Sequence, residues 1–191
     1  YILLDGAYEG FDVDREKIAF LSNGFHQAHP NFRFIWADVV HPDANPNSST
    51  QADSFRFPYP RNSFDLVFAA ALFNQLLPDA TANYFAQTAR VLKPGGRAMF
   101  SFFLLDNLRP RQSRPFGFSR PMFDFAHTLP QWGDGFAVGV AEHPTAMTGY
   151  RLSLIKQMAD IRAGLRDNPT MYPFAATLTD PQELADAAAY I

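Results

Sequence analysis

Two aspartates stand at the ends of short apolar runs whose composition is typical of β-strands. Asp12 lies near the end of the run at residues 8–13, and Asp38 directly follows the run at residues 32–37. In open parallel sheets, ligands bind in the crevice beyond the carboxyl ends of the strands. An acid at the end of the first of these strands commonly accepts hydrogen bonds from both ribose hydroxyls of an adenosine group. An acid at the end of the next strand can accept a hydrogen bond from the adenine amino group. The two carboxylates therefore indicate a site for an adenosine-containing ligand.

Helix capping is a second role that fits the same aspartates. Asp is a favoured N-cap residue, and both Asp12 and Asp14 precede a segment in which apolar residues recur at helical spacing. Those apolar residues are Ile18, Leu21 and Phe25. The spacing alone leaves Asp12 open between ribose binding and capping, and it leaves the role of Asp38 open as well.

The elements that would position these aspartates alternate between strands and helices. One helix is predicted after Asp14, up to a break at residues 29–31, and another from Pro78 to the turn at residues 93–96. A third helix is predicted at residues 150–165 and a short capped one at residues 180–184. Apolar runs predict strands at residues 8–13, 32–37, 64–70, 98–104 (buried) and 136–141. Alternation of this kind indicates a parallel sheet with helices on its faces.

Composition bounds the class of protein. The chain has 191 residues, which fits one domain, and 47% of them are hydrophobic, so a sizeable core can form. The formal net charge is −3, whereas a nucleic-acid binder usually carries an excess of basic residues. The longest apolar runs are far shorter than the ~20 residues of a membrane-spanning helix. The absence of Cys excludes disulfides and zinc-thiolate sites and suits a reducing cytoplasm. We therefore expect one cytoplasmic domain that neither binds nucleic acid nor spans a membrane.

Four segments, in order and at similar spacing, resemble the class I S-adenosylmethionine-dependent methyltransferases. They are residues 8–14, 34–39, 57–68 and 89–97. The strongest match is the last, Ala-Arg-Val-Leu-Lys-Pro-Gly-Gly-Arg, which is similar to the turn before the family's fifth strand. The resemblance implies an α/β fold with a Rossmann-like, mostly parallel sheet that has helices on both faces.

The resemblance also implies a set of cofactor-binding residues. Asp12 corresponds to the acid that holds the ribose of S-adenosylmethionine, and Asp38 corresponds to the acid on the adenine side. The neighbouring backbone group on that side comes from Val39, and two alanines after the next strand line the methyl-donor pocket. The residues assigned to the cofactor are Asp12, Val13, Asp38, Val39, Ala69 and Ala70.

The chain departs from the family at its start. The family's first strand and its glycine-rich loop, which wraps the methionine part of the cofactor, precede the segment that begins at Tyr8, and only residues 1–7 stand there. We therefore expect either a fragment, incomplete at the N-terminal side of its sheet, or a protein that has lost the loop. Without that loop the chain is expected to bind the cofactor poorly, because backbone N–H groups at the loop and helix start approach the ligand.

Residues 107–135 are a candidate substrate-covering insertion, rich in Phe, Pro and Arg. Phe116 and Trp132 are expected to wall an apolar acceptor pocket, and His127 is the best candidate for a base. The alternative is a long connection that packs its aromatic side chains on the sheet. Where related sequences often carry His, this chain has the amides Asn74 and Gln75, which do not titrate. The scattered His have no metal-binding spacing, so we expect no metal.

Three functions fit these observations. The first is transfer of a methyl group from S-adenosylmethionine to a small or lipid-like acceptor. Such a displacement depends on holding nucleophile, methyl and sulfur in line, so it needs no strong catalytic constellation. The second is a nicotinamide-dependent oxidoreductase, because an acid such as Asp12 also suits that fold, although the turn at residues 92–96 favours the first. The third is a non-catalytic, methyltransferase-like binding module, which follows if the glycine-rich loop is absent from the gene.

Overall fold

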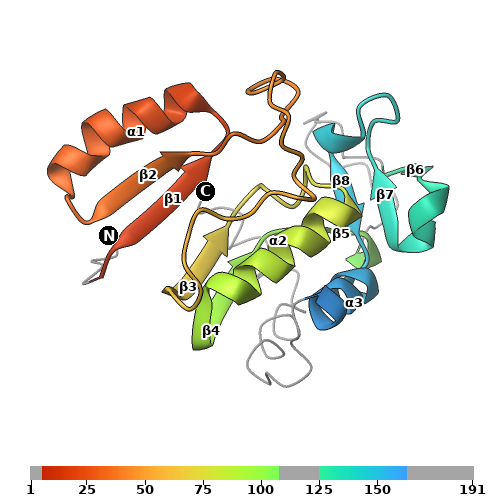
Figure 1. Ribbon diagram of the computed structural model, residues 1–191. Coiled ribbons are helices and arrows are strands. Elements are labelled where there is room, and N and C mark those ends of the chain that lie inside the picture. The colour runs from red at the N-terminus through yellow and green to blue at the C-terminus, as the bar shows by residue number, and fades with distance from the viewer. Residues whose placement is uncertain (1–5, 108–124, 163–191) are drawn as a thin grey trace, which may run out of the picture. The chain divides into compact units, whose positions relative to one another are not determined.

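The computed structural model describes residues 6–107 and 125–162 (Figure 1). The chain divides into two compact units, Tyr1–Phe55 and Arg56–Ile191. Each unit has its own β-strand pairing and its own helices, so each is described by itself. Phe116 and the helix predicted at residues 180–184 lie outside the described residues.

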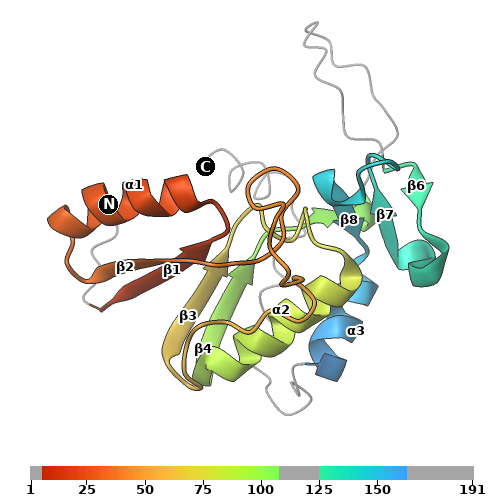
Figure 2. The ribbon, with the colours of Figure 1, turned by 45° about the horizontal axis from the view of Figure 1, so that its top comes forward.

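The first unit is a β-α-β arrangement built from β1 (Tyr8–Asp12), α1 (Arg15–Ala28) and β2 (Phe32–Trp36). The two strands pair in parallel, with Asp12 opposite Trp36 at their carboxyl ends. Helix α1 packs on this pair (Figure 2). The predicted strands at residues 8–13 and 32–37 are therefore confirmed as parallel neighbours.

Helix α1 begins and ends where local side-chain chemistry directs it. The Asp14 carboxylate accepts hydrogen bonds from the backbone N–H groups of Glu16 (3.0 Å) and Lys17 (3.1 Å), which have no partner inside the helix. At the other end, the His29 N–H donates to the Phe25 carbonyl and the helix stops before Pro30. The predicted capping by Asp14 and the break at residues 29–31 are both confirmed.

The Asp14 cap gives a testable pH dependence. Hydrogen bonds from Lys17 hold the pKa of Asp14 below its usual 3.8. A carboxyl whose folded-state pKa is lowered stabilises the fold above its unfolded pKa and loses that contribution as the pH falls through its folded pKa. We expect the urea midpoint of the wild type to fall relative to Asp14→Asn, whose amide also caps, as the pH drops from neutral to below 3.8. A difference between the two proteins that does not change with pH would contradict this assignment.

The second unit contains a parallel pair made of β3 (Phe64–Ala69) and β4 (Leu92–Phe100), connected through α2 (Pro78–Val91). Helix α2 begins with Pro at its first position, as predicted, and stops at Val91. It covers one face of the pair, where the Phe85 and Phe100 rings stack. The run at residues 98–104 was expected to be one buried strand. This is wrong, because β4 ends at Phe100, β5 begins only at Phe103, and Met99 of β4 is 52% exposed.

The turn at residues 92–96 has a structural explanation at each position. Gly95 has a φ of +78°, which favours glycine. A Cβ on Gly96 would stand 2.9 Å from the Lys93 carbonyl oxygen and 3.2 Å from that of Asp65. The Lys93 ammonium binds the Asp65 carboxylate at 2.8 Å. Leu92 already pairs with Phe64, so β4 starts before the turn rather than after it, with an irregular register at that point.

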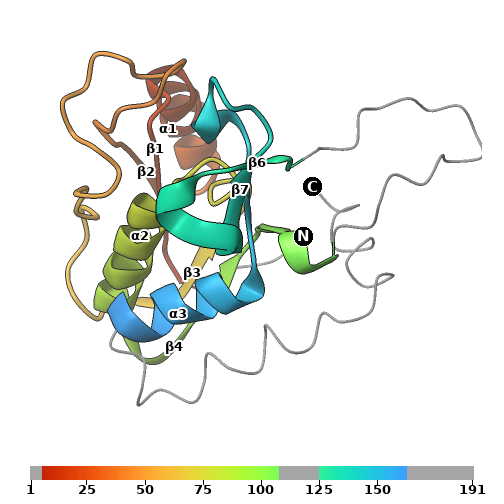
Figure 3. The ribbon, with the colours of Figure 1, turned by 90° about the vertical axis from the view of Figure 1, so that its right-hand side faces the viewer.

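Beyond β4 the second unit forms a small mixed sheet in the order β5-β8-β7-β6 (Figure 1), and Figure 3 shows its β6 and β7 from another side. Strands β5 and β8 pair in parallel, whereas β7 pairs antiparallel with both β8 and β6. Helix α3 packs against α2. These elements are β5 (Phe103–Leu104), η1 (Leu105–Asn107), β6 (His127–Thr128), η2 (Pro130–Gly135), β7 (Phe136–Val138), η3 (Pro144–Ala146), β8 (Thr148–Tyr150) and α3 (Leu152–Arg162).

The core of the second unit is an aromatic cluster beneath α2. Phe73 is its centre, 1% exposed, with ring centroids 5.4 Å from Phe85, 4.6 Å from Phe100 and 4.7 Å from Phe102. Tyr150 of β8 meets Phe102 edge-on at 5.5 Å. The predicted α/β, mostly parallel, Rossmann-like fold is confirmed, with antiparallel pairing among the described residues at β6 and β7.

Candidate cofactor-binding site

The carboxyl ends of β1 and β2 bring two acids to one edge of the first unit. The Ala37 N–H donates to the Asp12 carbonyl at 2.9 Å, which extends the strand pairing one step beyond β2. Asp38 follows at once, so both acids leave neighbouring parallel strands at the same edge. Both side chains are exposed. Two carboxylates therefore lie at the edge where open parallel sheets bind their ligands.

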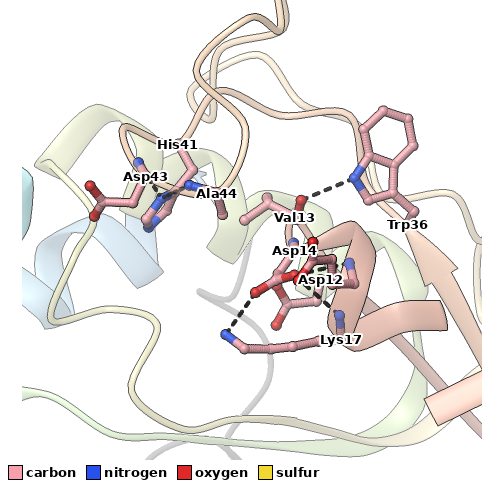
Figure 4. Close-up of polar contacts among 9 residues, drawn as sticks. Asp12, Val13, Asp14, Lys17, Trp36, His41, Asp43 and Ala44 are labelled. Carbon is pink, nitrogen blue, oxygen red and sulfur yellow. Dashed lines mark hydrogen bonds and ion pairs between the residues drawn. The ribbon is translucent and has the colours of Figure 1, made fainter. Parts of the chain in front are cut away.

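The structure separates the two roles that the sequence left open for Asp12. Asp14, not Asp12, caps α1 (Figure 4). The Oδ1 atom of Asp12 accepts the Asp14 N–H at 2.8 Å, which orients the carboxylate in the turn. Its Oδ2 atom has no hydrogen-bond partner among the described residues. Asp12 is therefore oriented by the turn and still has an oxygen open to a ligand.

Asp38 is held by the loop that follows it. The Asn45 side-chain amide donates to Asp38 Oδ1 at 3.0 Å and to the Val39 carbonyl at 3.1 Å. The hydrogen bond from Asn45 keeps the pKa of Asp38 below its usual value, and Ser48 and the positive charge of Arg15 also lower it. Asp38 is thus a charged acceptor at neutral pH. Sequence analysis missed Asn45, because a polar residue seven positions further along an irregular loop carries no periodic signal.

The two valines differ in what they offer to a ligand. The Val13 carbonyl accepts a hydrogen bond from the Trp36 indole at 3.0 Å, which ties the β1–α1 turn to the end of β2 (Figure 4). Val39 is 2% exposed, and its N–H already donates to the Ala37 carbonyl at 2.9 Å. The backbone group expected from Val39 is therefore engaged within the loop.

Arg15 and Trp36 form a contact that sequence analysis did not anticipate. The Arg15 guanidinium lies 4.0 Å from the centroid of the Trp36 ring. A cation over an indole face is attracted by the ring quadrupole. This contact places a flat apolar surface and a positive charge beside the two acids of the first unit.

The two alanines that the resemblance assigns to the cofactor lie at the carboxyl end of β3 in the second unit. Ala69 is the last residue of the strand and Ala70 begins the loop to α2. The Ser101 N–H donates to the Ala69 carbonyl at 3.2 Å, and the Ser101 hydroxyl accepts the Ala71 N–H at 2.8 Å. Ala71 has a φ of +54°, a conformation that costs a non-glycine residue about 1–2 kcal/mol. The two hydrogen bonds with Ser101 therefore hold Ala71 in an unfavourable backbone conformation.

The candidate acceptor residues that the structure describes lie on one connected segment of the mixed sheet. His127 is exposed on β6, where it pairs with Val138. Trp132, in η2, meets the fully buried Phe136 edge-on at 5.3 Å. Trp132 therefore packs on the core of the second unit, in keeping with the alternative of an aromatic-rich connection, while Phe116 lies outside the described residues.

The described residues include neither a metal-binding cluster nor a membrane-spanning helix. No group of three or more His, Cys, Asp or Glu in residues 6–107 and 125–162 could hold a metal ion. Among the helices in that same part of the chain, none has the length and apolar character needed to cross a membrane.

The parallel β-α-β arrangement, with an aspartate at the carboxyl end of each strand, defines a Rossmann-like α/β protein. Residues 10–100 match the family model described as "Methyltransferase domain". This match covers 91 of the 191 residues and agrees with the resemblance of the chain's motifs to the class I S-adenosylmethionine-dependent methyltransferases. The matched segment contains Asp12, Asp38, Ala69, Ala70 and the turn at residues 92–96.

Two solved structures are similar to this chain. One is the PH0226 protein of Pyrococcus horikoshii OT3, 20% identical over 53% of this chain and 38% of that one, with a TM-score of 0.39. Another is described as a SAM-dependent methyltransferase of Methanosarcina mazei, 17% identical over 78% of this chain and 67% of that one, with a TM-score of 0.39. The chain thus spans well under half the length of the first protein and about two thirds of the second.

Proposed function

We propose that this protein transfers a methyl group from S-adenosylmethionine to a small or lipid-like acceptor, with Asp12 and Asp38 holding the adenosine part. One observation carries the proposal: two charged acceptors leave adjacent parallel strands at one edge of the first unit. Asp12 has one carboxylate oxygen without a partner among the described residues, and Asp38 is held by Asn45. Both lie within the segment that matches the methyltransferase domain.

The residues present fit such a cofactor. The open oxygen of Asp12 can accept hydrogen bonds from ribose hydroxyls, and Asp38 can accept one from the adenine amino group. Hydrogen bonds to a charged acceptor are roughly twice as strong as neutral ones. When bound, the cofactor supplies a sulfonium methyl group with a good leaving group. The resemblance assigns the donor-methyl end to Ala69 and Ala70, whose small side chains leave room for it.

The acceptor side is proposed on chemical grounds. Methyl transfer needs alignment of the reacting atoms more than a strong base, so the amides Asn74 and Gln75 are compatible with it. His127 and Trp132 remain proposed acceptor contacts, His127 because its side chain is exposed. We also propose a cytoplasmic location, since a chain of 191 residues without Cys suits a reducing compartment.

A comparison of S-adenosylmethionine binding with NADH binding distinguishes the proposed methyltransferase from a nicotinamide-dependent oxidoreductase. The protein, as its gene encodes it, is titrated calorimetrically with S-adenosylmethionine and, separately, with NADH. We expect saturable binding of S-adenosylmethionine, competition by S-adenosylhomocysteine, and no displacement by NADH. Displacement by NADH at comparable concentration would overturn the proposal in favour of the nicotinamide alternative. Binding without transfer of labelled methyl to any acceptor in a metabolite and lipid extract would instead support a non-catalytic binding module.

A further inference from the structure

The loop between β3 and α2, residues 70–77, is anchored by two fully buried side chains of β8. The Thr148 hydroxyl donates to the Phe73 carbonyl at 2.9 Å, and the Thr148 N–H donates to the Asn74 carbonyl at 2.8 Å. The Tyr150 hydroxyl donates to the Leu76 carbonyl. Thr148 and Tyr150 are both 0% exposed. Three carbonyl groups within four residues of this loop are therefore fixed by one short strand.

The hydroxyl groups at this anchor have defined donor directions. Burial raises the pKa of Tyr150, so its hydroxyl stays protonated at neutral pH. Because its single proton goes to the Leu76 carbonyl, the contact of 2.9 Å with Thr81 must be donated by the Thr81 hydroxyl. Thr81 is itself 0% exposed and lies in the first turns of α2. The anchor thus joins β8, the loop and the start of α2 in one buried network.

Two features of the loop at residues 70–77 are unfavourable for its own stability. Ala71 holds a positive φ, and the side-chain oxygen of Asn74 is buried with no hydrogen-bond partner among the described residues. Strained conformations and unpaired buried polar atoms persist only where the surroundings impose them, and they gather at functional sites. The loop also starts at the carboxyl end of a parallel strand, where ligands of such sheets bind. An imposed conformation at this position indicates a role in binding rather than in folding.

We propose that Thr148 and Tyr150 are positioning residues for methyl transfer, which hold the loop at residues 70–77 in the conformation that receives the methionine end of the cofactor. This inference rests on the proposed function. Neither side chain touches the reacting atoms. They act through the carbonyl groups of the loop, and so fix the backbone that carries the small Ala70 and Ala71 side chains.

A pair of substitutions at one position isolates the hydroxyl contact. Thr148→Val removes the hydroxyl and keeps the shape, whereas Thr148→Ser keeps the hydroxyl. Tyr150→Phe removes the second contact. For each variant of the protein as its gene encodes it, calorimetry gives the dissociation constants of two probes, S-adenosylmethionine and adenosine. Adenosine lacks the methionine end, so its affinity reports only the adenosine part of the site.

We expect Thr148→Val and Tyr150→Phe each to weaken S-adenosylmethionine binding by about tenfold, the effect of one lost buried hydrogen bond. Adenosine affinity should stay at the wild-type value, and Thr148→Ser should restore S-adenosylmethionine binding. Backbone amide exchange at Gln75, whose N–H donates to the Leu72 carbonyl, should accelerate in the same two variants.

The outcomes separate this inference from the function on which it rests. If the wild type binds S-adenosylmethionine and the variants lose thermal stability but keep the ratio of the two affinities, the anchor is only structural and the inference is wrong. If the wild type binds neither probe, the proposed function fails, and this inference fails with it. If both affinities fall together in Thr148→Val, the loop does not act on the methionine end alone, which also overturns the inference.

Discussion

Asp12→Ala is expected to weaken S-adenosylmethionine binding by about 1–3 kcal/mol, which is about 5- to 150-fold in the dissociation constant. The carboxylate is oriented by the Asp14 N–H at 2.8 Å and has a second oxygen open to a ligand. Its removal would leave ribose hydroxyls without a charged acceptor, and charge-assisted hydrogen bonds are among the strongest that a surface site can form. Calorimetric titration of the protein as its gene encodes it measures the change directly.

Asp43→Ala is the matched control for this experiment. Asp43 is an exposed carboxylate of the same unit, and its backbone N–H, not its side chain, contacts His41 (Figure 4). The control removes the same charge without removing a strand-end acceptor, so its affinity should stay close to that of the wild type. Equal affinities for wild type and Asp12→Ala would exclude Asp12 from the site. Equal losses in both variants would show that only the overall charge matters.

Phe73→Ala is expected to lower the free energy of unfolding by about 3–5 kcal/mol, the usual range for truncating a buried Phe. The Phe73 ring is 1% exposed and touches the rings of Phe85, Phe100 and Phe102. Truncation removes its buried apolar area and leaves a cavity between β4 and α2. The loss is large against the 5–15 kcal/mol by which a typical domain is stable. Urea unfolding followed by circular dichroism measures it.

Phe20→Ala provides the comparison for the core variant. Phe20 lies on α1 and is 76% exposed. Removing an exposed ring from a helix surface changes the free energy of unfolding by about 0.5 kcal/mol or less, in either direction. A similar loss in both variants would show that Phe73 is not packed as the structure has it. Because Phe73 also begins the anchored part of the loop at residues 70–77, this result bears on the stability of the proposed site.

The motif that most strongly indicated the family has a structural explanation rather than a chemical one. Arg90 donates from its guanidinium to the carbonyls of Phe57 and Tyr59, at 2.8 and 2.7 Å. It also donates to the Gln87 side chain at 2.8 Å. These contacts hold the chain before β3 against the end of α2, and the Lys93–Asp65 ion pair joins the start of β4 to β3. The motif therefore identifies the fold, and evidence for the chemistry has to come from the strand-end acids.

Features governed by a few consecutive residues were predictable from the sequence of this protein. Asp14 caps α1 and Pro78 starts α2, because each depends only on backbone geometry within one turn of chain. The position of Asp12 and Asp38 beyond their strands followed from the apolar runs before them. The family resemblance rested on these same local segments.

The tertiary structure alone decided how those residues are supported. It showed that Asp14 caps α1 and that Asp12 does not, and it placed Asn45 within hydrogen-bond distance of Asp38. It also joined Thr148 and Tyr150 to a loop that lies 75 and 74 residues earlier in the sequence. Hydrogen bonds between residues so far apart leave no periodic pattern in a sequence, because they exist only once separate elements have packed together and excluded water from the groups that they pair.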